Sequence, residues 1–387
     1  MSQAPRVAFF TDSFHETNGV ALTSRQLESF ARRRQLPVLS VRAGPETRWT
    51  AGTLELARGA AAFPVERDMS FDLLFLRHRT LAADIVRRFR AEVVHITGPS
   101  DVGILGAWVA HRLHLPLVAS WHTNLHEFGA KRLEKVFAWL PPDPRQDLAS
   151  FTERGILESC ARFYRLARVL MAPNPELVQL LARRTGRDVF LMRRGVDTDL
   201  FTPARRTRTG GEFVLGYCGR ITAEKSVRFL KDIQNAIPGV RFLIIGDGGE
   251  RRWLEQNLKN AEFPGILKGE ALAAAYADMD LFVFPSRTDT YGNVVQEALA
   301  SGVPCIVTAA GGPKFLVKDG ETGFIARDNA EFLEAVVRVV GNRELHARLS
   351  EAARKQALTL SWDRVFEEVY DVYRYALTPP PLFRTAS

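Results

Sequence analysis

Residues 281–304 read LFVFPSRTDTYGNVVQEALASGVP, and this stretch decides the fold. Its continuous apolar start, Leu281–Pro285, is typical of a parallel strand that is covered on both faces. A loop follows, and a helix is predicted to begin near Gly292-Asn293 and to carry Glu297 on its first turns. The next apolar run, Pro304–Thr308, predicts a second strand. This order of elements indicates an α/β sheet.

The same alternation of short apolar runs and amphipathic stretches extends through the chain in both directions. In the first half, strands are predicted at Val7–Thr11, Pro37–Arg42, Val93–Thr97, Leu117–Ser120, Val169–Ala172 and Val189–Met192. In the second half, further strands are predicted at Phe213–Cys218, Arg241–Ile245, Gly265–Leu267 and Gly323–Ile325. We therefore expect two Rossmann-like α/β domains with parallel sheets that face a central cleft.

A change of composition at residues 202–211 separates the two series of strands. The stretch is polar and contains a proline and two glycines, which is typical of a linker. We predict a first domain at residues 1–203, a second at 204–377 and a mobile, proline-rich tail at 378–387. The last helix, Ser361–Leu377, has aromatic residues at helical spacing that indicate packing, and it is expected to return to the first domain.

Composition excludes several classes of protein. Of the 387 residues, 46% are apolar, and the 25 Phe and 6 Trp provide enough core to exclude a disordered chain. No apolar run reaches the ~18–20 residues of a membrane span, and the first residues lack the features of a signal peptide. Three widely spaced cysteines argue against a disulfide framework and for reduced thiols. Together these features predict a cytoplasmic protein.

Sequence motifs of other enzyme classes are missing. Gly246-Asp-Gly-Gly-Glu250 lacks the third glycine of a dinucleotide-binding loop, and the chain has neither a P-loop nor a Gly-x-Ser-x-Gly elbow. His122 and His126 have a spacing that could bind zinc on a helix, but no third ligand is evident. We therefore expect neither a metal nor another cofactor.

The start of the helix near Gly292-Asn293 has the character of a phosphate site. Free backbone N–H groups and the positive end of the helix dipole meet at such a position. Asp289 and Glu297 flank it, and carboxylates there would repel a phosphate. We therefore expect these two side chains to accept hydrogen bonds from sugar hydroxyls.

The block resembles the signature of the retaining glycosyltransferases of family 4, which have the GT-B fold. The family pattern is a glutamate, seven residues and a second glutamate, and this sequence has Asp289, seven residues and Glu297. Gly219–Lys225 is similar to the family's Gly-Arg-Leu-x-x-Glu-Lys segment, and Arg194–Pro203 resembles its interdomain segment. The resemblance extends from residue 6 to about residue 377, with the motifs in the family's order.

The resemblance implies roles for individual residues. Glu297 is expected to accept hydrogen bonds from the ribose hydroxyls, while Asp289 and His122 are expected to orient the donor sugar in catalysis. The residues implied at the donor diphosphate are Arg220, Lys225, Gly292, Asn293 and Gly19. Those implied at the nucleotide, besides Glu297, are Gly246, Asp247, Lys268 and Gly269.

These features predict a metal-independent glycosyltransferase, and the resemblance implies that it is retaining. It would move a hexose from a UDP- or GDP-linked sugar to a lipid-linked or saccharide acceptor. The resemblance implies attack on the same face of the sugar, with the leaving phosphate assisting deprotonation. The alternatives are a sugar-nucleotide epimerase of the same fold and a non-catalytic nucleotide-sugar binder. The length disfavours a glycogen-type phosphorylase, and no nucleic-acid recognition motif is found.

Positive charge is concentrated in the first half of the chain. The net charge is +8, and residues 1–200 hold 28 Lys and Arg against 21 Asp and Glu. The segment Gly129–Pro141 places three basic residues beside Phe137 and Trp139, as in helices that lie on anionic membranes. A helix that packs its aromatic residues inward explains the pattern equally well. Peripheral contact with the inner face of a membrane is therefore a hypothesis.

Overall fold

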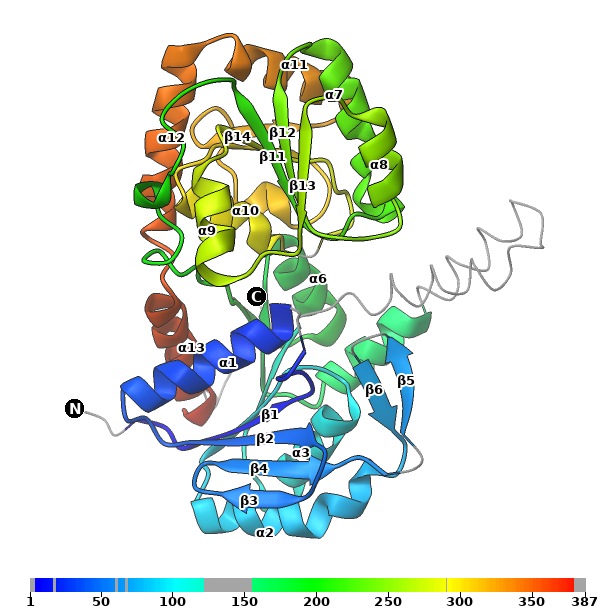
Figure 1. The fold of residues 1–387 in the computed structure, drawn as a ribbon. Helices are drawn as coiled ribbons and strands as arrows, with labels where there is room; N and C mark the ends of the chain where they lie inside the picture. Colours follow the sequence, from blue (N-terminus) through cyan, green and yellow to red (C-terminus); the bar gives the residue numbers. More distant parts are fainter. Residues whose placement is uncertain are drawn as a thin grey trace. The chain divides into compact units, whose positions relative to one another are not determined.

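The computed structural model describes residues 4–16, 19–59, 62–66, 69–121, 155–289 and 291–378. These residues form two compact units (Figure 1). Unit 1 contains the described residues up to Arg193 and those from Val365 onward, and unit 2 is formed by Arg194–Arg364. Both units are α/β, as the sequence predicts.

Unit 1 is built on an eight-stranded sheet with the order β10-β9-β8-β7-β1-β2-β4-β3. All neighbouring strands in it are parallel except the β3–β4 pair. Its strands are β1 (Val7–Thr11), β2 (Val38–Gly44), β3 (Arg48–Thr50), β4 (Thr53–Ala57), β7 (Val93–Ile96), β8 (Leu117–Ser120), β9 (Val169–Ala172) and β10 (Asp188–Leu191). A separate antiparallel pair is formed by β5 (Ala62–Glu66) and β6 (Met69–Asp72).

Helices cover both faces of this sheet, with α1 and α13 on one face and α2 and α3 on the other (Figure 1). Among its described residues, unit 1 contains the helices α1 (Gly19–Arg33), η1 (Phe75–His78), α2 (Arg79–Phe89), α3 (Asp101–Leu113), a stretch at 155–164, α6 (Pro175–Thr185) and most of α13 (Trp362–Leu377). Because helices lie on both faces, β1, β7, β8 and β9 are buried along their whole length. This explains their continuous apolar sequences.

The last helix, α13, packs in unit 1, which confirms the prediction that it returns to the first domain. The centre of the Phe366 ring lies 5.5 Å from the centre of the Phe30 ring of α1. The Tyr373 hydroxyl lies 2.7 Å from Nδ1 of His95, and Nε2 of the same ring lies 3.0 Å from the Ser120 hydroxyl. Burial lowers the pKa of His95 to about 3, so its ring is neutral and serves packing.

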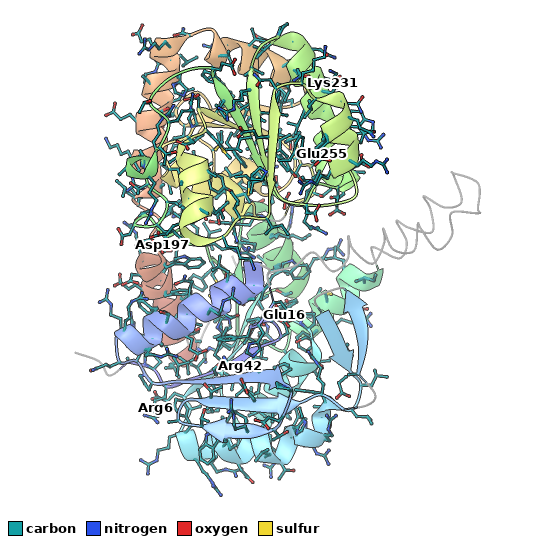
Figure 2. The ribbon with its side chains drawn as sticks, in the orientation of Figure 1. Arg6, Glu16, Arg42, Asp197, Lys231 and Glu255 are labelled. Atoms are coloured by element: carbon teal, nitrogen blue, oxygen red, sulfur yellow. The ribbon has the colours of Figure 1, made fainter. Side chains whose placement is uncertain are left out.

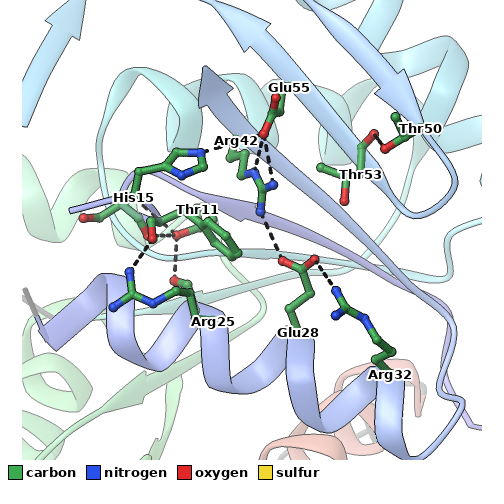
Figure 3. A network of polar contacts seen from close by, with 12 residues as sticks. Thr11, His15, Arg25, Glu28, Arg32, Arg42, Thr50, Thr53 and Glu55 are labelled. Carbon is green, nitrogen blue, oxygen red and sulfur yellow. Dashed lines mark hydrogen bonds and ion pairs between the residues drawn. The ribbon is translucent and has the colours of Figure 1, made fainter. Parts of the chain in front are cut away.

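A polar network ties α1 to the sheet of unit 1 (Figure 3). The Arg42 guanidinium, on β2, donates to Glu55 of β4 at 3.0 Å and to Glu28 of α1 at 3.2 Å. The guanidinium carbon of Arg42 also lies 3.7 Å from the centre of the Phe14 ring. Burial acts to raise the pKa of Glu55, but the bonds and charge of Arg42 outweigh it and hold that pKa below its usual value. The network stabilises the packing of α1 against β2 and β4 through charge-assisted hydrogen bonds.

Unit 2 is built on a six-stranded parallel sheet with the order β13-β12-β11-β14-β15-β16. Its strands are β11 (Val214–Cys218), β12 (Arg241–Ile245), β13 (Ala261–Gly265), β14 (Leu281–Phe284), β15 (Cys305–Thr308) and β16 (Gly323–Ala326). The prediction of a strand at Gly265–Leu267 was wrong, because the edge strand β13 precedes it. In β13, partly buried and exposed residues alternate, so it lacks the apolar run that marks the central strands.

Helices cover this sheet on both faces as well, with α7 and α8 on one side and α9, α10 and α12 on the other (Figure 1). Figure 2 labels Lys231 on α7 and Glu255 on α8. The helices of unit 2 are η2 (Pro203–Arg205), η3 (Ala223–Lys225), η4 (Val227–Phe229), α7 (Leu230–Ala236), α8 (Arg251–Asn257), α9 (Gly269–Ala277), α10 (Asn293–Ala300), η5 (Pro313–Phe315), α11 (Asn329–Val340) and α12 (Arg343–Ala357).

Unit 2 begins at Arg194, before the stretch that composition marks as a linker. The Val196 N–H donates to the Leu360 carbonyl at 3.0 Å, so the first and last segments of unit 2 run side by side. A Cβ atom on Gly195 would lie 2.6 Å from Cα of Trp362, which explains why glycine stands there.

Two aspartate side chains hold residues 202–211 against the rest of unit 2. The Arg206 and Arg208 guanidinium groups pair with Asp280, and the Thr207 hydroxyl donates to Asp278 at 2.6 Å. These ionic and hydrogen-bonded contacts hold the polar stretch within unit 2, which begins at Arg194.

Candidate active site

The order of strands in unit 2 indicates where a ligand would bind to the sheet. The chain builds outward from β11 to β13 and then crosses back to β14, on the other side of β11. In such sheets ligands bind outside the carboxyl ends of the strands at this reversal. Lys225 follows β11 and Asp289 follows β14, and the Lys225 ammonium lies 2.7 Å from the Asp289 carboxylate. The fold therefore joins two predicted site residues that are distant in sequence.

Glycines allow two neighbouring loops to touch through their backbones at this edge. The Gly219 N–H donates to the Ile245 carbonyl at 3.0 Å, and the Ile221 N–H donates to the Asp247 carbonyl at 2.9 Å. Gly246 has a φ of +133°, and a Cβ atom on it would lie 1.9 Å from the Gly219 carbonyl oxygen. Only glycine fits such a close approach.

Gly246→Ala should therefore lower the thermal unfolding midpoint by roughly 3–10 °C, because the new methyl group forces the two loops apart. Gly249→Ala is the matched control, since a Cβ atom on Gly249 would meet no heavy atom within 4 Å and its φ is not positive. Differential scanning calorimetry of both variants measures the effect. Equal midpoints for the two variants would contradict the packing described for these loops.

The N-terminus of α10 offers backbone donors to a ligand. Its N-cap is Gly292, with a φ of +93°, and no side chain caps the first turn. A Cβ atom on Gly292 would lie 2.9 Å from Cγ of Pro313, so a larger residue would also crowd the turn. An uncapped helix start combines free N–H groups with the positive end of the helix dipole. Such a helix start can accept a phosphate, and the phosphate-binding role of Gly292 and Asn293 stays a prediction.

Glu297 lies farther along α10 and is partly buried. Burial raises the pKa of its carboxyl to about 7, and the Tyr276 hydroxyl opposes this shift. Burial, followed by the charge of Glu297, raises the pKa of the Cys218 thiol to about 12. Three titratable groups from α10, α9 and the end of β11 are therefore close enough to influence one another. Of these three, Glu297 is the group that titrates near neutral pH.

The other residues of unit 2 that are predicted to bind the diphosphate or the nucleotide are exposed, and their contacts differ. The Arg220 side chain is 65% exposed, and its guanidinium pairs with Glu224 at 2.6 Å. Asp247 is exposed, and its carboxylate accepts from the Gly248 N–H at 2.9 Å. Lys268 and Gly269 are exposed at the start of α9, the helix that carries Tyr276.

Two further predicted site residues, Gly19 and His122, do not lie among the described residues of unit 2. Gly19 begins α1 in unit 1, and its carbonyl accepts from the Thr23 hydroxyl at 2.8 Å. His122 lies outside the described residues, as does the segment at 129–141. Their assigned roles stay predictions. Within the described ranges, no group of three or more His, Cys, Asp or Glu residues is placed to hold a metal ion.

Sequence analysis missed several polar groups around the site. The hydroxyls of Ser286 and Thr222 are buried, and neither has a hydrogen-bond partner among the described residues, while the buried Tyr276 hydroxyl lies close to Glu297. Buried hydroxyls are normally satisfied, so those of Ser286 and Thr222 are suited to meet a ligand or water. Tyr276 lies in an alanine-rich helical sequence that predicts only packing, and no local pattern distinguishes it.

Comparison with known proteins adds an independent result. Residues 212–342 match the family model described as "Glycosyl transferases group 1", and residues 18–200 match "Glycosyltransferase Family 4". A GDP-mannose-dependent alpha-mannosyltransferase of Mycobacterium tuberculosis is 33% identical over 298 residues, which are 74% of each chain. A sulfoquinovosyl transferase of Arabidopsis thaliana is 29% identical over 79% of this chain and 60% of its own length.

Solved structures show the same fold. A glycosyltransferase from Rickettsia africae has a TM-score of 0.71 at 13% identity, over 98% of this chain and 100% of that one. A sucrose-phosphate synthase from Thermosynechococcus elongatus has a TM-score of 0.68 at 19% identity, over 96% and 99% of the two chains. With two α/β units of GT-B architecture and these sequence relatives, the chain belongs to the group 1 glycosyl transferases of glycosyltransferase family 4.

Proposed function

We propose that this glycosyltransferase moves a hexose, with retention of configuration, from a nucleoside-diphosphate sugar to a lipid-linked or saccharide acceptor. The observation that supports this most directly is the pairing of Lys225 with Asp289 after β11 and β14, with Glu297 close to Cys218 at the end of β11. The uncapped start of α10 lies in the same region, with Asp289 before it and Glu297 within the helix. The cation and the helix N-terminus would suit the diphosphate of such a donor, and the Glu297 carboxylate would suit the diol of its ribose.

Each residue contributes a different interaction in this proposal. Ionised Glu297 accepts from the two ribose hydroxyls. Lys225, Arg220 and the α10 N–H groups bind the diphosphate and stabilise the negative charge that develops on it. Asp289 keeps Lys225 in place before the donor arrives, and it then accepts from the sugar together with His122.

The transfer breaks the bond between the sugar C1 and the phosphate oxygen, and the electron pair leaves with the diphosphate. The acceptor hydroxyl oxygen forms the new bond on the same face of C1. Its proton passes to the leaving phosphate oxygen, so the step needs no separate protein base. Preorganised positive groups around the diphosphate lower the barrier because they stabilise this charge separation.

Donor turnover tests the proposal. GDP-mannose is the first donor to try because several relatives that match most of the chain are named as GDP-mannose-dependent, with UDP- and ADP-sugars in parallel. Transfer to an acceptor with an unchanged anomeric configuration, measured by proton NMR, is the expected result. A donor epimerised at a sugar carbon without transfer would support the epimerase instead. Tight donor binding with neither reaction would support a non-catalytic binder.

We expect catalysis to be independent of divalent metal. Lys225 and the start of α10 supply positive charge where a metal would otherwise act on the diphosphate. Dialysis against EDTA, followed by assays with and without added Mg²⁺ or Mn²⁺, should leave kcat within about twofold of the untreated enzyme. Loss of activity that either ion restores would contradict this expectation. The dialysed protein's unfolding midpoint serves as the control for damage.

A lipid-linked acceptor would bring the enzyme to a membrane surface. No helix among the described residues is both long enough and apolar enough to cross a bilayer, so contact in this proposal is peripheral. Co-sedimentation with anionic vesicles at low salt, and release at high salt, would support it, because salt screens surface charge. Protein that stays in the supernatant at low salt would favour a soluble saccharide acceptor.

A further inference from the structure

Arg194, the first residue of unit 2, carries a buried positive charge without a carboxylate partner in the part of the chain that the structure describes. The residue is only 8% exposed. Its Nη1 donates to the Asn293 side-chain oxygen at 3.2 Å, and its Nε has no hydrogen-bond partner. Buried arginines are normally paired with an anion. The positive charge of this one is therefore available to a ligand.

The backbone of Arg194 is fastened to the start of α10. The Tyr291 hydroxyl accepts from the Arg194 N–H and donates to the Arg194 carbonyl, both at 2.9 Å. The Gln296 amide donates to the same carbonyl at 2.8 Å. The guanidinium carbon lies 5.3 Å from the centre of the Tyr291 ring. These contacts hold the guanidinium beside Asn293, the first residue of α10.

This placement is unfavourable unless an anion is present. The N-terminus of α10 is the positive end of a helix dipole, and the arginine adds a full positive charge next to it. Two positive groups in a poorly solvated position repel each other. Lys225, by contrast, has Asp289 as its counter-ion. An oxyanion bound at the start of α10 would relieve the repulsion and satisfy the free donors.

We propose that Arg194 is a positioning residue for a phosphate group, acting through Asn293 and the start of α10 on the diphosphate of the donor. The inference rests on the proposed function, because it takes the bound anion to belong to a nucleoside-diphosphate sugar. An acceptor phosphate has the same chemistry and is distinguished by the experiment below.

The experiment compares binding of GDP, GMP and guanosine, with the uridine series in parallel, by isothermal titration calorimetry. R194M and R194Q remove the charge, and R194K keeps it. Both neutral variants should bind the nucleoside diphosphate roughly 10–100-fold more weakly, as expected for loss of a charge-assisted interaction, and the nucleoside within about twofold of normal. R194K should recover most of the lost affinity. If R194M does not fold, R194Q provides the comparison, since its amide can still contact Asn293.

R354M is the matched control. The Arg354 guanidinium donates to backbone carbonyls in unit 2. One of them is the Ala300 carbonyl at 2.6 Å, at the opposite end of α10 from Asn293. Its loss should leave the preference for diphosphate over nucleoside unchanged.

Three results would overturn the assignment. The neutral variants could keep the native preference for the diphosphate, or they could weaken diphosphate and nucleoside equally, as a purely structural role would. They could also change only the KM of a phosphate-bearing acceptor, which would place the anion on the acceptor. Native protein that binds no nucleoside diphosphate would overturn the proposed function and this inference together. The three results above would overturn this inference alone, so the two failures are distinguishable.

Discussion

Replacing Lys225 by Met should lower kcat for glycosyl transfer by roughly 100–1,000-fold, the usual effect of removing one donor to a developing oxyanion. Lys225 is buried beside Asp289 at the carboxyl edge of the second sheet. Methionine keeps much of the side-chain volume but removes the charge, and it leaves Asp289 to repel the diphosphate. Initial rates under saturating donor measure the loss. Turnover close to the native value would remove Lys225 from the proposed site.

Two further variants separate the causes of the Lys225 effect. K225M/D289N removes both charges, so it should recover part of the donor affinity that K225M loses while remaining slow in transfer. K231M is the matched control, because Lys231 lies on α7 and its ammonium donates to the Gln234 side chain at 3.2 Å, within the same helix. It should have native kinetics and a native unfolding midpoint.

Replacing Glu297 by Gln should raise the donor KM and lower kcat/KM by roughly 10–100-fold. The carboxylate can accept from two hydroxyls of one ribose, whereas an amide presents only one acceptor oxygen. The nucleoside alone should lose affinity by the same factor, since the contact is with the ribose. E255Q, on the surface of α8, is the control and should behave as the native enzyme. Equal affinity of E297Q and native protein for the nucleoside would contradict the ribose assignment.

Glu297 should also make donor binding depend on pH. Burial raises the pKa of its carboxyl from about 4.5 to about 7, and the ionised form is the better acceptor. Donor affinity of the native protein should therefore increase as pH rises through about 7, and in E297Q this increase should disappear. Cys218 and Tyr276 stay neutral throughout, because burial raises both of their pKa values far above this range.

Stability should respond to pH in the opposite direction. A carboxyl whose pKa is raised on folding holds its proton more tightly in the native state, so its stabilising contribution is complete below pH 4.5. That contribution is lost as pH rises toward 7. The unfolding midpoint of native protein relative to E297Q should consequently fall between these values and then level off. A difference that does not change with pH would mean that the carboxyl titrates normally.

The sequence predicts most central strands because their physical environment leaves a local signature. The predicted bounds of β1, β8, β9 and β12 agree with the structure, because strands covered on both faces need continuous apolar residues. The prediction missed β3 to β6. In β3, every residue of Arg48–Thr50 is exposed, so no hydrophobic pattern marks it. Edge strands are stabilised by pairing with a neighbour, and that partner cannot be read from their own residues.

Local spacing likewise predicts site residues at Asp289, Glu297 and the helix start at Gly292-Asn293, because they lie in one short strand–loop–helix segment. The sequence alone thus determined the α/β class and the resemblance to family 4, and it predicts the phosphate-binding character of that helix start. Tertiary structure decided which distant groups meet there. The Lys225–Asp289 pair, Tyr276 near Glu297 and Arg194 against Asn293 all join separate segments of unit 2. The physical reason is that pKa values, ion pairing and unsatisfied charge depend on neighbours in space, and the order of strands in the sheet chooses those neighbours.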